Sequence, residues 1–367
     1  MNDLIYQLAV AGVRQLVPYQ PGKPIEELQR ELGLSEIIKL ASNENPLGPS
    51  PKAVAAMQLA LPELALYPDG SGYRLKQALA EKYKVAPEQI TLGNGSNELL
   101  ELAARAFLTP ELSVVYSEHA FAVYPLVTQA VGATGIAATA KAYGHDLTAM
   151  RQAITDNTRL VFIANPNNPT GSLLPQTEVK AFIADLPETV LCILDEAYVE
   201  FVASNPADDS IHWLAEFPNL IITRTFSKAY GLAGLRVGYG LSSPALADIL
   251  NRVRQPFNNN SLALAAAEAA LNDTEHLQQT VANNRAGMQQ FIDGFKTLGL
   301  EWLPSAGNFI SVALGREGLP VYQALLAKGV IVRPVANYGM PQHLRISIGK
   351  PEQNARCLQA LADVLAA

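Results

Sequence analysis

Three polar segments near the middle of the chain carry side chains suited to chemistry. The segments 165–171, 195–198 and 223–228 each begin where a short apolar run ends, and they bring an asparagine, an aspartate and a lysine. Short apolar runs at this spacing are typical of buried parallel strands. Open α/β sheets bind ligands at the carboxyl ends of their strands. The sequence therefore predicts that these side chains meet at one edge of a sheet.

The residue types in these segments suit an aldehyde cofactor with a pyridine ring. The amine of Lys228 can form a Schiff base with an aldehyde, which amine substrates then displace. A carboxylate such as Asp195 can keep a pyridine nitrogen protonated, which makes the ring a better electron acceptor. Tyr198 and Asn168 can donate hydrogen bonds to a phenolate oxygen on the ring. We therefore expect pyridoxal 5′-phosphate (PLP) as cofactor, with Lys228, Asp195 and Tyr198 as catalytic residues.

The cofactor phosphate needs N–H donors and positive charge. A glycine-containing loop at 93–97 leads directly into a predicted helix, and a helix N-terminus offers free N–H groups to an anion. The segment around the lysine can add hydroxyl groups and a guanidinium. The residues that we expect to contact the cofactor from these two segments are Gly95, Ser96, Asn97, Thr225, Ser227 and Arg236.

The length and composition favour a globular chain with two cores. The chain has 367 residues, of which 49% are hydrophobic and 17% are charged, so disorder is not expected. This length suits a large α/β domain and a smaller one. The formal net charge is −7 and no long basic run occurs, which argues against nucleic acid as a partner.

Apolar patterning divides the chain into an arm and two domains. Residues 1–40 contain a turn-rich stretch and are expected to form an N-terminal arm. Residues 41–255 alternate apolar runs with helical stretches, which predicts a mostly parallel sheet covered on both faces. Residues 256–367 contain an Ala-rich helix at 261–271 and a long amphipathic helix at about 273–298, followed by a smaller α/β pattern.

Cysteine and histidine usage does not indicate a metal site. Cys192 and Cys357 can make neither a disulfide framework nor a zinc site. His119 and His145 have no partners at metal-ligand spacing. No signal peptide and no membrane-spanning run is visible in the sequence. We expect a cytoplasmic protein that binds neither metal nor membrane.

Together, these motifs resemble those of fold-type-I aminotransferases. The resemblance is carried by the strings at 43–48, 165–171, 195–198, 227–236 and 344–349, which occur in the family's order. Each string alone is weak, whereas five in the right order are specific. Among these enzymes the sequence is most similar to histidinol-phosphate aminotransferases, over essentially the whole chain.

The resemblance implies a fold and an assembly. The fold is α/β, with a large PLP-binding domain built on a mostly parallel seven-stranded sheet between helices, and a smaller α/β domain. The assembly is a homodimer with shared active sites, in which the arm packs on the small domain and on the partner. Tyr67 would reach the cofactor phosphate of the partner subunit. Phe121 would stack on the pyridine ring, at a position where family members often carry tyrosine.

The resemblance also implies a reaction in histidine biosynthesis. L-histidinol phosphate would pass its amino group to 2-oxoglutarate, giving imidazole-acetol phosphate and glutamate. Histidinol phosphate carries a phosphomethyl group where glutamate carries a carboxylate, so one anion site at Arg345 can serve both. The residues expected to contact the substrate are Tyr19, Asn45, Arg333 and Arg345.

Each of these residues also has a purely structural interpretation. A lysine at a strand end is most often a solvated surface group, Asp195 can cap a helix, and Asn168 can serve only as a turn residue. Phe121 can be a plain core residue. Exposed arginines on strands are common, so the role of Arg345 rests on the resemblance. The presence of all three polar segments at one predicted sheet edge favours the functional interpretation.

Three other functions remain open at the level of the sequence. An aromatic amino-acid aminotransferase would keep the reaction, because phenyl and imidazole side chains fill similar pockets. A threonine-phosphate decarboxylase would keep the cofactor residues and break a different bond at Cα. A transcription regulator with an aminotransferase-like domain is disfavoured, because the chain has no helix-turn-helix segment.

Overall fold

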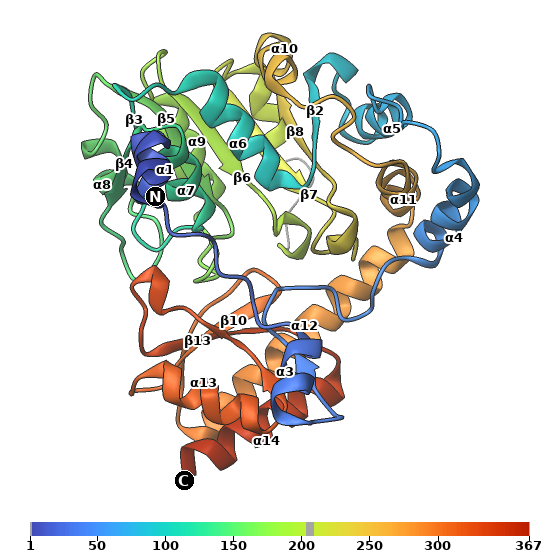
Figure 1. The fold of residues 1–367 in the computed structure, drawn as a ribbon, viewed down its shortest axis with the longest axis vertical. Coiled ribbons are helices and arrows are strands. Elements are labelled where there is room, and N and C mark those ends of the chain that lie inside the picture. Colours follow the sequence, from blue (N-terminus) through green and yellow to red (C-terminus); the bar gives the residue numbers. More distant parts are fainter. Residues whose placement is uncertain (1, 203–208, 367) are drawn as a thin grey trace.

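A seven-stranded sheet forms the centre of the larger lobe in the computed structural model, which describes residues 2–202 and 209–366 (Figure 1). The strand order is β2-β8-β7-β6-β5-β3-β4. Only the two pairs that involve β8 are antiparallel among these strands, which confirms the expected mostly parallel sheet. The strands are β2 (Ile90–Gly93), β3 (Ser113–Ser117), β4 (Thr134–Ala138), β5 (Thr158–Ala164), β6 (Leu191–Asp195), β7 (Leu220–Thr225) and β8 (Gly238–Ser242).

Helices cover both faces of this sheet, because alternate strand residues point to opposite sides. On β5, Leu160 and Phe162 pack in one apolar cluster with α6, α7 and α10, whereas Val161 and Ile163 pack in another with α5, α8, α9 and α11. The helices are α4 (Pro51–Ala60), α5 (Tyr73–Tyr83), α6 (Ser96–Phe107), α7 (Val123–Ala130), α8 (Leu147–Gln152), α9 (Gln176–Ala184), α10 (Pro244–Val253) and α11 (Ser261–Leu271). Short 3₁₀ turns occur at η1 (Leu61–Glu63), η2 (Pro87–Gln89), η3 (Val199–Phe201), η5 (Ser210–Ala215) and η6 (Ala233–Leu235).

The smaller lobe is built on a four-stranded antiparallel sheet of order β12-β13-β10-β9, beside the parallel pair β1–β11. Phe291, Phe295, Leu325 and Leu361 are fully buried in its core. Its elements are β1 (Ile38–Lys39), β9 (Glu301–Leu303), β10 (Phe309–Ala313), α13 (Gly318–Ala327), β11 (Val330–Ile331), β12 (Arg333–Pro334), η7 (Ala336–Tyr338), β13 (His343–Ser347) and α14 (Pro351–Ala366).

The long helix α12 (Thr274–Leu298) connects the two lobes. Figure 1 shows it running from beside α11 and α4 into the smaller lobe, where it packs on α14. The helix before it, α11, packs on α4 and α5 and shares the core of the larger lobe. We therefore propose a large and a small domain whose boundary lies at the start of α12, rather than at residue 256 as expected from the sequence.

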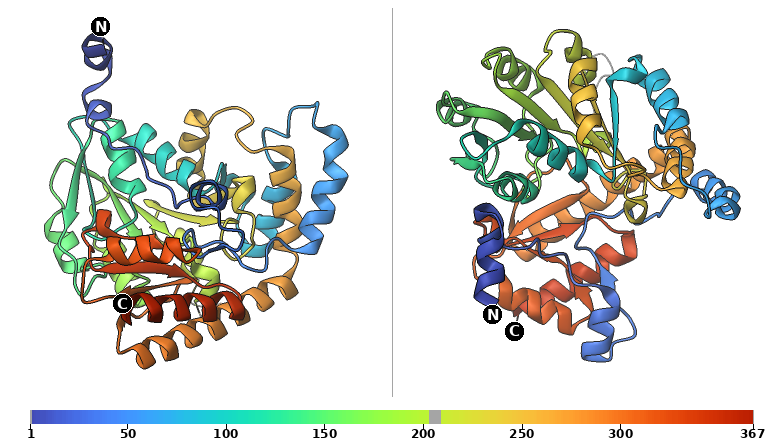
Figure 2. Two further views of the ribbon diagram at one scale, coloured as in Figure 1. Left: turned by 60° about the horizontal axis from the view of Figure 1, so that its bottom comes forward. Right: turned by 45° about the horizontal axis from the view of Figure 1, so that its top comes forward.

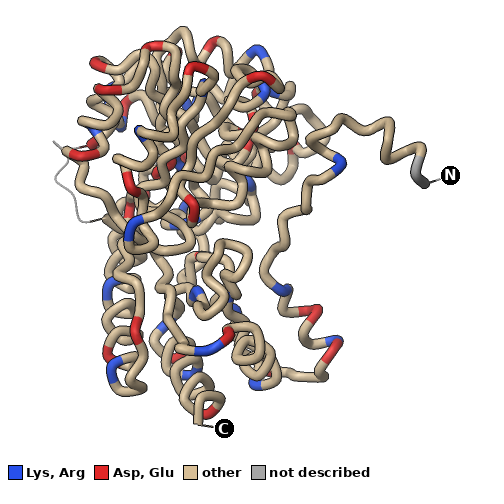
Figure 3. Tube along the Cα trace, turned by 90° about the vertical axis from the view of Figure 1, so that its left-hand side faces the viewer, with Lys and Arg blue, Asp and Glu red and all other residues tan. Residues whose placement is uncertain are grey.

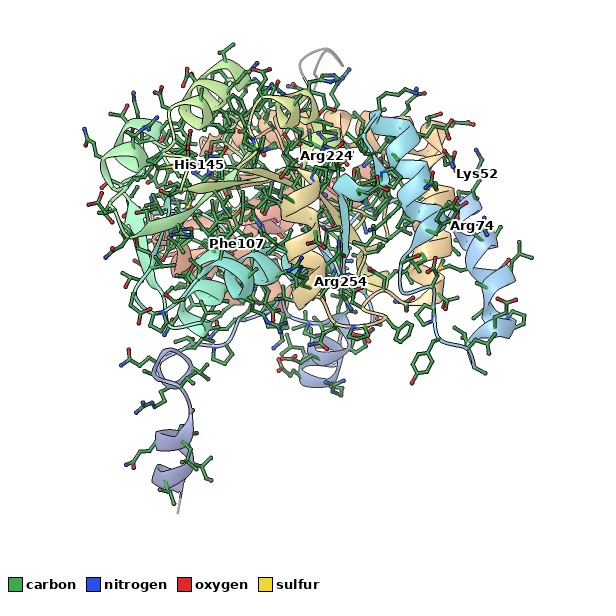
Figure 4. The ribbon with its side chains drawn as sticks, turned by 90° about the horizontal axis from the view of Figure 1, so that it is seen from above. Lys52, Arg74, Phe107, His145, Arg224 and Arg254 are labelled. Atoms are coloured by element: carbon green, nitrogen blue, oxygen red, sulfur yellow. The ribbon has the colours of Figure 1, made fainter. Side chains whose placement is uncertain are left out.

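Local capping explains where the outer helices of the larger lobe begin. The hydroxyl of Ser50 accepts hydrogen bonds from two backbone N–H groups at the start of α4. The side chain of Asn260 accepts one hydrogen bond from a backbone N–H group at the start of α11. Lys52 and Arg74, labelled in Figure 4, lie at the outer edge of this lobe. Arg74 on α5 pairs with Glu268 on α11 at 2.9 Å, so ion pairing adds to the apolar contact between these helices.

The N-terminal arm contains α1 (Asn2–Leu8), α2 (Ala11–Arg14) and α3 (Ile25–Leu32). Leu28 of α3 packs on Ile331 in the smaller lobe, and α2 contacts α7. Figures 2 and 3 show α1 projecting away from both lobes, and its residues Leu4 and Leu8 are exposed. Within the ranges 2–202 and 209–366, no helix combines the length and the hydropathy needed to cross a membrane.

Candidate active site

A cavity of about 330 Å³ lies between the lobes, at the carboxyl ends of β5, β6 and β7. Thirteen of the residues predicted from the sequence line this cavity, and some of them belong to the smaller lobe. The predicted residues that line it are Tyr19, Ser96, Asn97, Phe121, Asn168, Asp195, Tyr198, Thr225, Ser227, Lys228, Arg236, Arg333 and Arg345.

Asp195 is buried at the end of β6, with Ala164 of β5 and Thr223 of β7 as its strand neighbours. The Tyr124 hydroxyl donates to its Oδ2 at 2.9 Å, and the Thr223 hydroxyl donates to Oδ1 at 3.2 Å. Burial raises the pKa of Asp195 to about 6, and these two hydrogen bonds oppose the rise. The carboxyl group can therefore share a proton with a bound base near neutral pH.

Lys228 follows the end of β7 and reaches the same cavity. Its Nζ donates to the carbonyl oxygen of Ser42 at 3.0 Å. Burial is the main cause that lowers the pKa of Lys228 to about 7, and the positive charges of Arg345 and Arg236 add to it. A large fraction of this amine is therefore neutral, and hence nucleophilic, at physiological pH.

The N-terminus of α6 meets Arg236 at one end of the cavity. Gly95 precedes the helix with φ 78°, and a Cβ atom placed on it would lie 2.3 Å from Arg236 Nη2. A Cβ atom on Gly238 would lie 2.5 Å from the backbone nitrogen of Ser96. Arg236 Nη1 donates to Ser227 Oγ at 3.2 Å. The two glycines thus allow free N–H groups, a hydroxyl and a guanidinium to converge as an anion site.

Two arginines of the smaller lobe form the opposite wall. Arg345 on β13 is buried and donates to Asn168 Oδ1 and to the carbonyl oxygen of Ala41, both at 2.6 Å. Burial lowers the pKa of Arg345, and its Nε has no hydrogen-bond partner among the described residues. Arg333 lies over the ring of Tyr19 with its Cζ 5.7 Å from the centroid. This wall is suited to the anionic end of a substrate.

Comparison with known proteins assigns the chain to a family. The family model described as aminotransferase class I and II matches residues 35–361. The chain belongs to the class I and II aminotransferases. Two curated relatives of this aminotransferase, from Pseudomonas fluorescens and Pseudomonas aeruginosa, are named histidinol-phosphate aminotransferase 2. They are 62% and 60% identical to it over 368 residues, which cover all of each chain.

A solved structure resembles this aminotransferase over nearly its whole length. The histidinol-phosphate aminotransferase from Sinorhizobium meliloti, in complex with pyridoxal-5′-phosphate, has a TM-score of 0.91 and 31% sequence identity. The match covers 98% of each chain. The fold-type-I architecture expected from the sequence is therefore confirmed, with its seven-stranded sheet and smaller α/β part.

The donor set of the aminotransferase fits PLP. An amine with a lowered pKa suits the aldehyde, a buried carboxyl group suits the pyridine nitrogen, and the site at the α6 N-terminus suits a phosphate. The glycine positions are informative here, because side chains at Gly95 and Gly238 would fill the space that brings Arg236 and Ser96 together.

Three predicted residues do not line the cavity of their own subunit: Gly95, described above, and Asn45 and Tyr67. Asn45 donates to the carbonyl oxygen of Ala229 and to Thr280 Oγ1, both at 3.0 Å. These contacts occupy the amide nitrogen of Asn45, and its expected contact with the substrate stays a prediction. Tyr67 is 83% exposed and stacks on Phe257 with ring centroids 4.8 Å apart.

Residues that sequence reasoning missed complete the site. Tyr124 lies one helical turn after Phe121 and meets it edge-on, so the spacing offered a signal. Thr223 faces the same side of β7 as Thr225, which strand alternation also indicates. Asn43 donates a hydrogen bond to the Tyr198 hydroxyl. The two residues are far apart in the sequence, and no local sequence pattern predicts this contact.

Proposed function

We propose that this aminotransferase transfers the amino group of L-histidinol phosphate to 2-oxoglutarate, giving imidazole-acetol phosphate and glutamate, with PLP as cofactor. The observation that carries the proposal is one cavity that holds the Lys228 amine, the Asp195 carboxyl and the Arg345 guanidinium. The names of the full-length relatives, at 56–62% identity, support the same substrate. The complex of the Sinorhizobium meliloti enzyme supports the same cofactor.

PLP, when bound, supplies an electrophilic aldehyde and a ring that accepts electron density from the substrate Cα. In our proposal Lys228 holds the cofactor covalently, Asp195 keeps the pyridine nitrogen protonated, and Phe121 covers one ring face. Tyr198 and Asn168 donate to the ring oxygen. The residues proposed to hold the phosphate end are Gly95, Ser96, Asn97, Thr225, Ser227 and Arg236.

Proton transfer at the substrate is assigned to Lys228. Once an amine substrate has displaced it, its Nζ accepts the proton from the substrate Cα as general base and later returns it as general acid. A pKa of about 7 suits both steps, because the amine can be neutral for the first and charged for the second near physiological pH.

The substrate's anionic end is assigned to the two-arginine wall. Arg345 would bind the phosphate of histidinol phosphate in one half of the reaction and a carboxylate of the second substrate in the other half. Arg333 and Tyr19 would complete this part of the site. Bidentate pairing of a guanidinium suits both phosphate and carboxylate groups.

We also propose a homodimer in which Tyr67 completes the partner's phosphate site. Its exposed ring, away from the cavity of its own subunit, supports this role. The projecting α1 would pack on the partner subunit. A cytoplasmic location stays a prediction from the sequence.

A substrate panel tests the proposed reaction. We would compare kcat/KM for L-histidinol phosphate, phenylalanine, tyrosine and threonine phosphate, with 2-oxoglutarate as acceptor, while measuring glutamate and carbon dioxide. The proposal predicts the highest kcat/KM for L-histidinol phosphate, with glutamate as product. A higher value for the aromatic amino acids would contradict the substrate. Carbon dioxide release without glutamate would replace transamination by decarboxylation.

A further inference from the structure

Asn43 joins the two lobes at the edge of the cavity. It is buried in the loop after β1, with φ 55°, a left-handed conformation that asparagine tolerates better than most residues. Its backbone N–H donates to Ser347 Oγ at 2.8 Å, and its carbonyl oxygen accepts from Asn308 Nδ2 at 2.9 Å. Both partners belong to the smaller lobe, whereas the side-chain amide reaches Tyr198 in the larger lobe.

One orientation of the Asn43 amide satisfies the groups around it. The Ser347 hydroxyl oxygen accepts the Asn43 N–H, so its own proton requires an acceptor. Asn43 Oδ1, at 3.0 Å, is the acceptor that the described residues provide for it. Nδ2 then faces Tyr198 and donates to its hydroxyl oxygen at 2.9 Å. The reverse orientation would leave the Ser347 proton unpaired in a buried site, which costs free energy.

The Asn43 donor restricts the direction of the Tyr198 proton. Tyr198 is 4% exposed, and burial raises the pKa of its hydroxyl, so the group keeps its proton at neutral pH. Because Asn43 donates to the hydroxyl oxygen, the Tyr198 O–H cannot be donated to Asn43. Among the described residues the protein offers this O–H no other acceptor. Tyr198 lines the cavity, which is the direction that remains.

We propose that Asn43, held in orientation by Ser347, is a positioning residue that directs the Tyr198 proton into the cavity, toward the ring oxygen of the cofactor. The inference rests on the proposed function and deepens it. It assigns to Asn43 a role that acts through Tyr198 and requires no contact with substrate.

The same loop makes this arrangement depend on the smaller lobe. The carbonyl oxygen of Leu40 accepts from the backbone N–H of Ser347 at 2.8 Å, and that of Ala41 accepts from Arg345 Nη2 at 2.6 Å. The loop that carries Asn43 is thus tied to alternate residues of β13 in the smaller lobe.

A pH titration of the visible band of protein-bound PLP tests the proposal without turnover. A donor to the ring oxygen lowers the pH at which the lysine-linked nitrogen titrates, so losing it raises the midpoint. Asn43→Asp keeps the side-chain shape and tolerates the left-handed backbone, but its carboxylate accepts the Tyr198 proton. We expect its midpoint to rise by about one pH unit, toward the midpoint of Tyr198→Phe.

A double variant separates the hydrogen bond from the added charge. If the effect passes through Tyr198, Asn43→Asp should shift the midpoint much less in the Tyr198→Phe background than in the native protein. An undiminished shift in that background would show a direct charge effect and overturn the proposal. A native-like midpoint for Asn43→Asp beside a shifted Tyr198→Phe would overturn it as well.

Ser347→Ala provides a neutral second variant, and Ser113→Ala is its matched control. Ser113 is a buried serine on β3 that pairs with Thr158 Oγ1 at 3.1 Å, outside the cavity. Ser347→Ala should raise the midpoint by less than Asn43→Asp, and Ser113→Ala should not move it. If Asn43→Asp does not fold, an unchanged midpoint in Ser347→Ala refutes the proposal. A native protein without any PLP band refutes the proposed function itself, and this inference with it.

Discussion

Burial shifts the two central ionisable residues in opposite directions and brings their pKa values close together. It lowers the pKa of Lys228 to about 7 and raises that of Asp195 to about 6, because each charged form loses solvation. An amine and a carboxyl group with such values can both exchange protons near neutral pH. Both residues lie at strand ends, which is why the sequence alone indicated them.

The lowered pKa of Lys228 predicts how cofactor capture depends on pH. The neutral amine is the reactive form, so the rate at which cofactor-free protein acquires the visible PLP band should rise with pH and level off above about 7. Stopped-flow absorbance between pH 5 and 10 would measure this rate. The titration of free PLP over the same pH range is the reference, because the ionisation of PLP also affects the rate. A rate that still rises about tenfold per pH unit above pH 8 would indicate an ordinary lysine and contradict the assignment.

Tyr124 supports Asp195 through one hydrogen bond, which lowers the pKa of the carboxyl group. Tyr124→Phe should therefore raise that pKa and weaken the contact with the pyridine nitrogen. We expect kcat to fall about tenfold with little change in KM for the amine, since one hydrogen bond to a charged group is lost. Tyr116→Phe, at a partly buried tyrosine on β3, is the control. Equal kinetics for the two variants would exclude a role for Tyr124.

The sequence did not predict the role of Asn43, because its contacts join separate segments of the chain. Asn43 meets Tyr198 and Ser347 only because the loop after β1 crosses from one lobe to the other. Asn45 belongs to the same motif, yet its amide is used by Ala229 and Thr280. Shared membership in a motif did not distinguish the two roles, because the difference arises from long-range packing.

At the scale of elements, strand alternation separates the site from a structural ion cluster. Asp195 and Thr225 face the cavity, whereas Glu196 and Arg224 point to the opposite side of the sheet. There Arg224 pairs with Glu196 and with Asp209, both at 2.7 Å, as a buried network (Arg224 is labelled in Figure 4). A buried arginine with two carboxylate partners has the pairing that burial of charge requires.

The contact between β8 and the start of α6 gives an element-scale prediction. A Cβ atom on Gly238 would lie 2.5 Å from the backbone nitrogen of Ser96, which cannot move without displacing the helix start. Gly238→Ala should therefore lower PLP affinity at least about tenfold, since the phosphate site is distorted. Gly240→Ala on the same strand is the control, because its nearest contact is 3.4 Å away. Fluorescence titration would measure the PLP affinity. Equal affinity in both variants would show that a Cβ atom at position 238 does not distort the phosphate site.

Sequence patterns predicted the buried elements better than those at the edges. The apolar runs before the three polar segments correspond to β5, β6 and β7, and the helix expected at 261–271 begins and ends as expected. The pattern missed β4 (Thr134–Ala138), because this edge strand is largely exposed and has no continuous apolar run. It also missed the short β2 and β9, whose lengths of four and three residues carry little periodicity.

At the scale of the whole molecule, the exposed apolar residues favour assembly. Leu4, Ile5 and Leu8 on α1 are each more than 60% exposed, and so are Leu66 and Tyr67 beside the larger lobe. Exposed apolar side chains at each of these two places are candidates for contact with another chain. A second copy of the chain is the partner that the proposed shared site requires.

The shared site predicts that Tyr67 acts on cofactor affinity only within the dimer. Tyr67→Phe should raise the Kd for PLP about tenfold by loss of one hydrogen bond to the phosphate, while sedimentation still shows a dimer. Tyr73→Phe, at an exposed tyrosine nearby on α5, should leave the Kd unchanged. Full PLP affinity in a monomeric form of the protein would refute the shared site.

The most direct test of the whole account is a single turnover with L-histidinol phosphate and no acceptor. The PLP-loaded native protein and Lys228→Ala would each be mixed with the substrate, while the visible band and the released keto product are followed together. The account predicts that the native protein loses its band and forms one equivalent of imidazole-acetol phosphate, whereas Lys228→Ala forms none on that timescale. Equal product formation by the two proteins would contradict it.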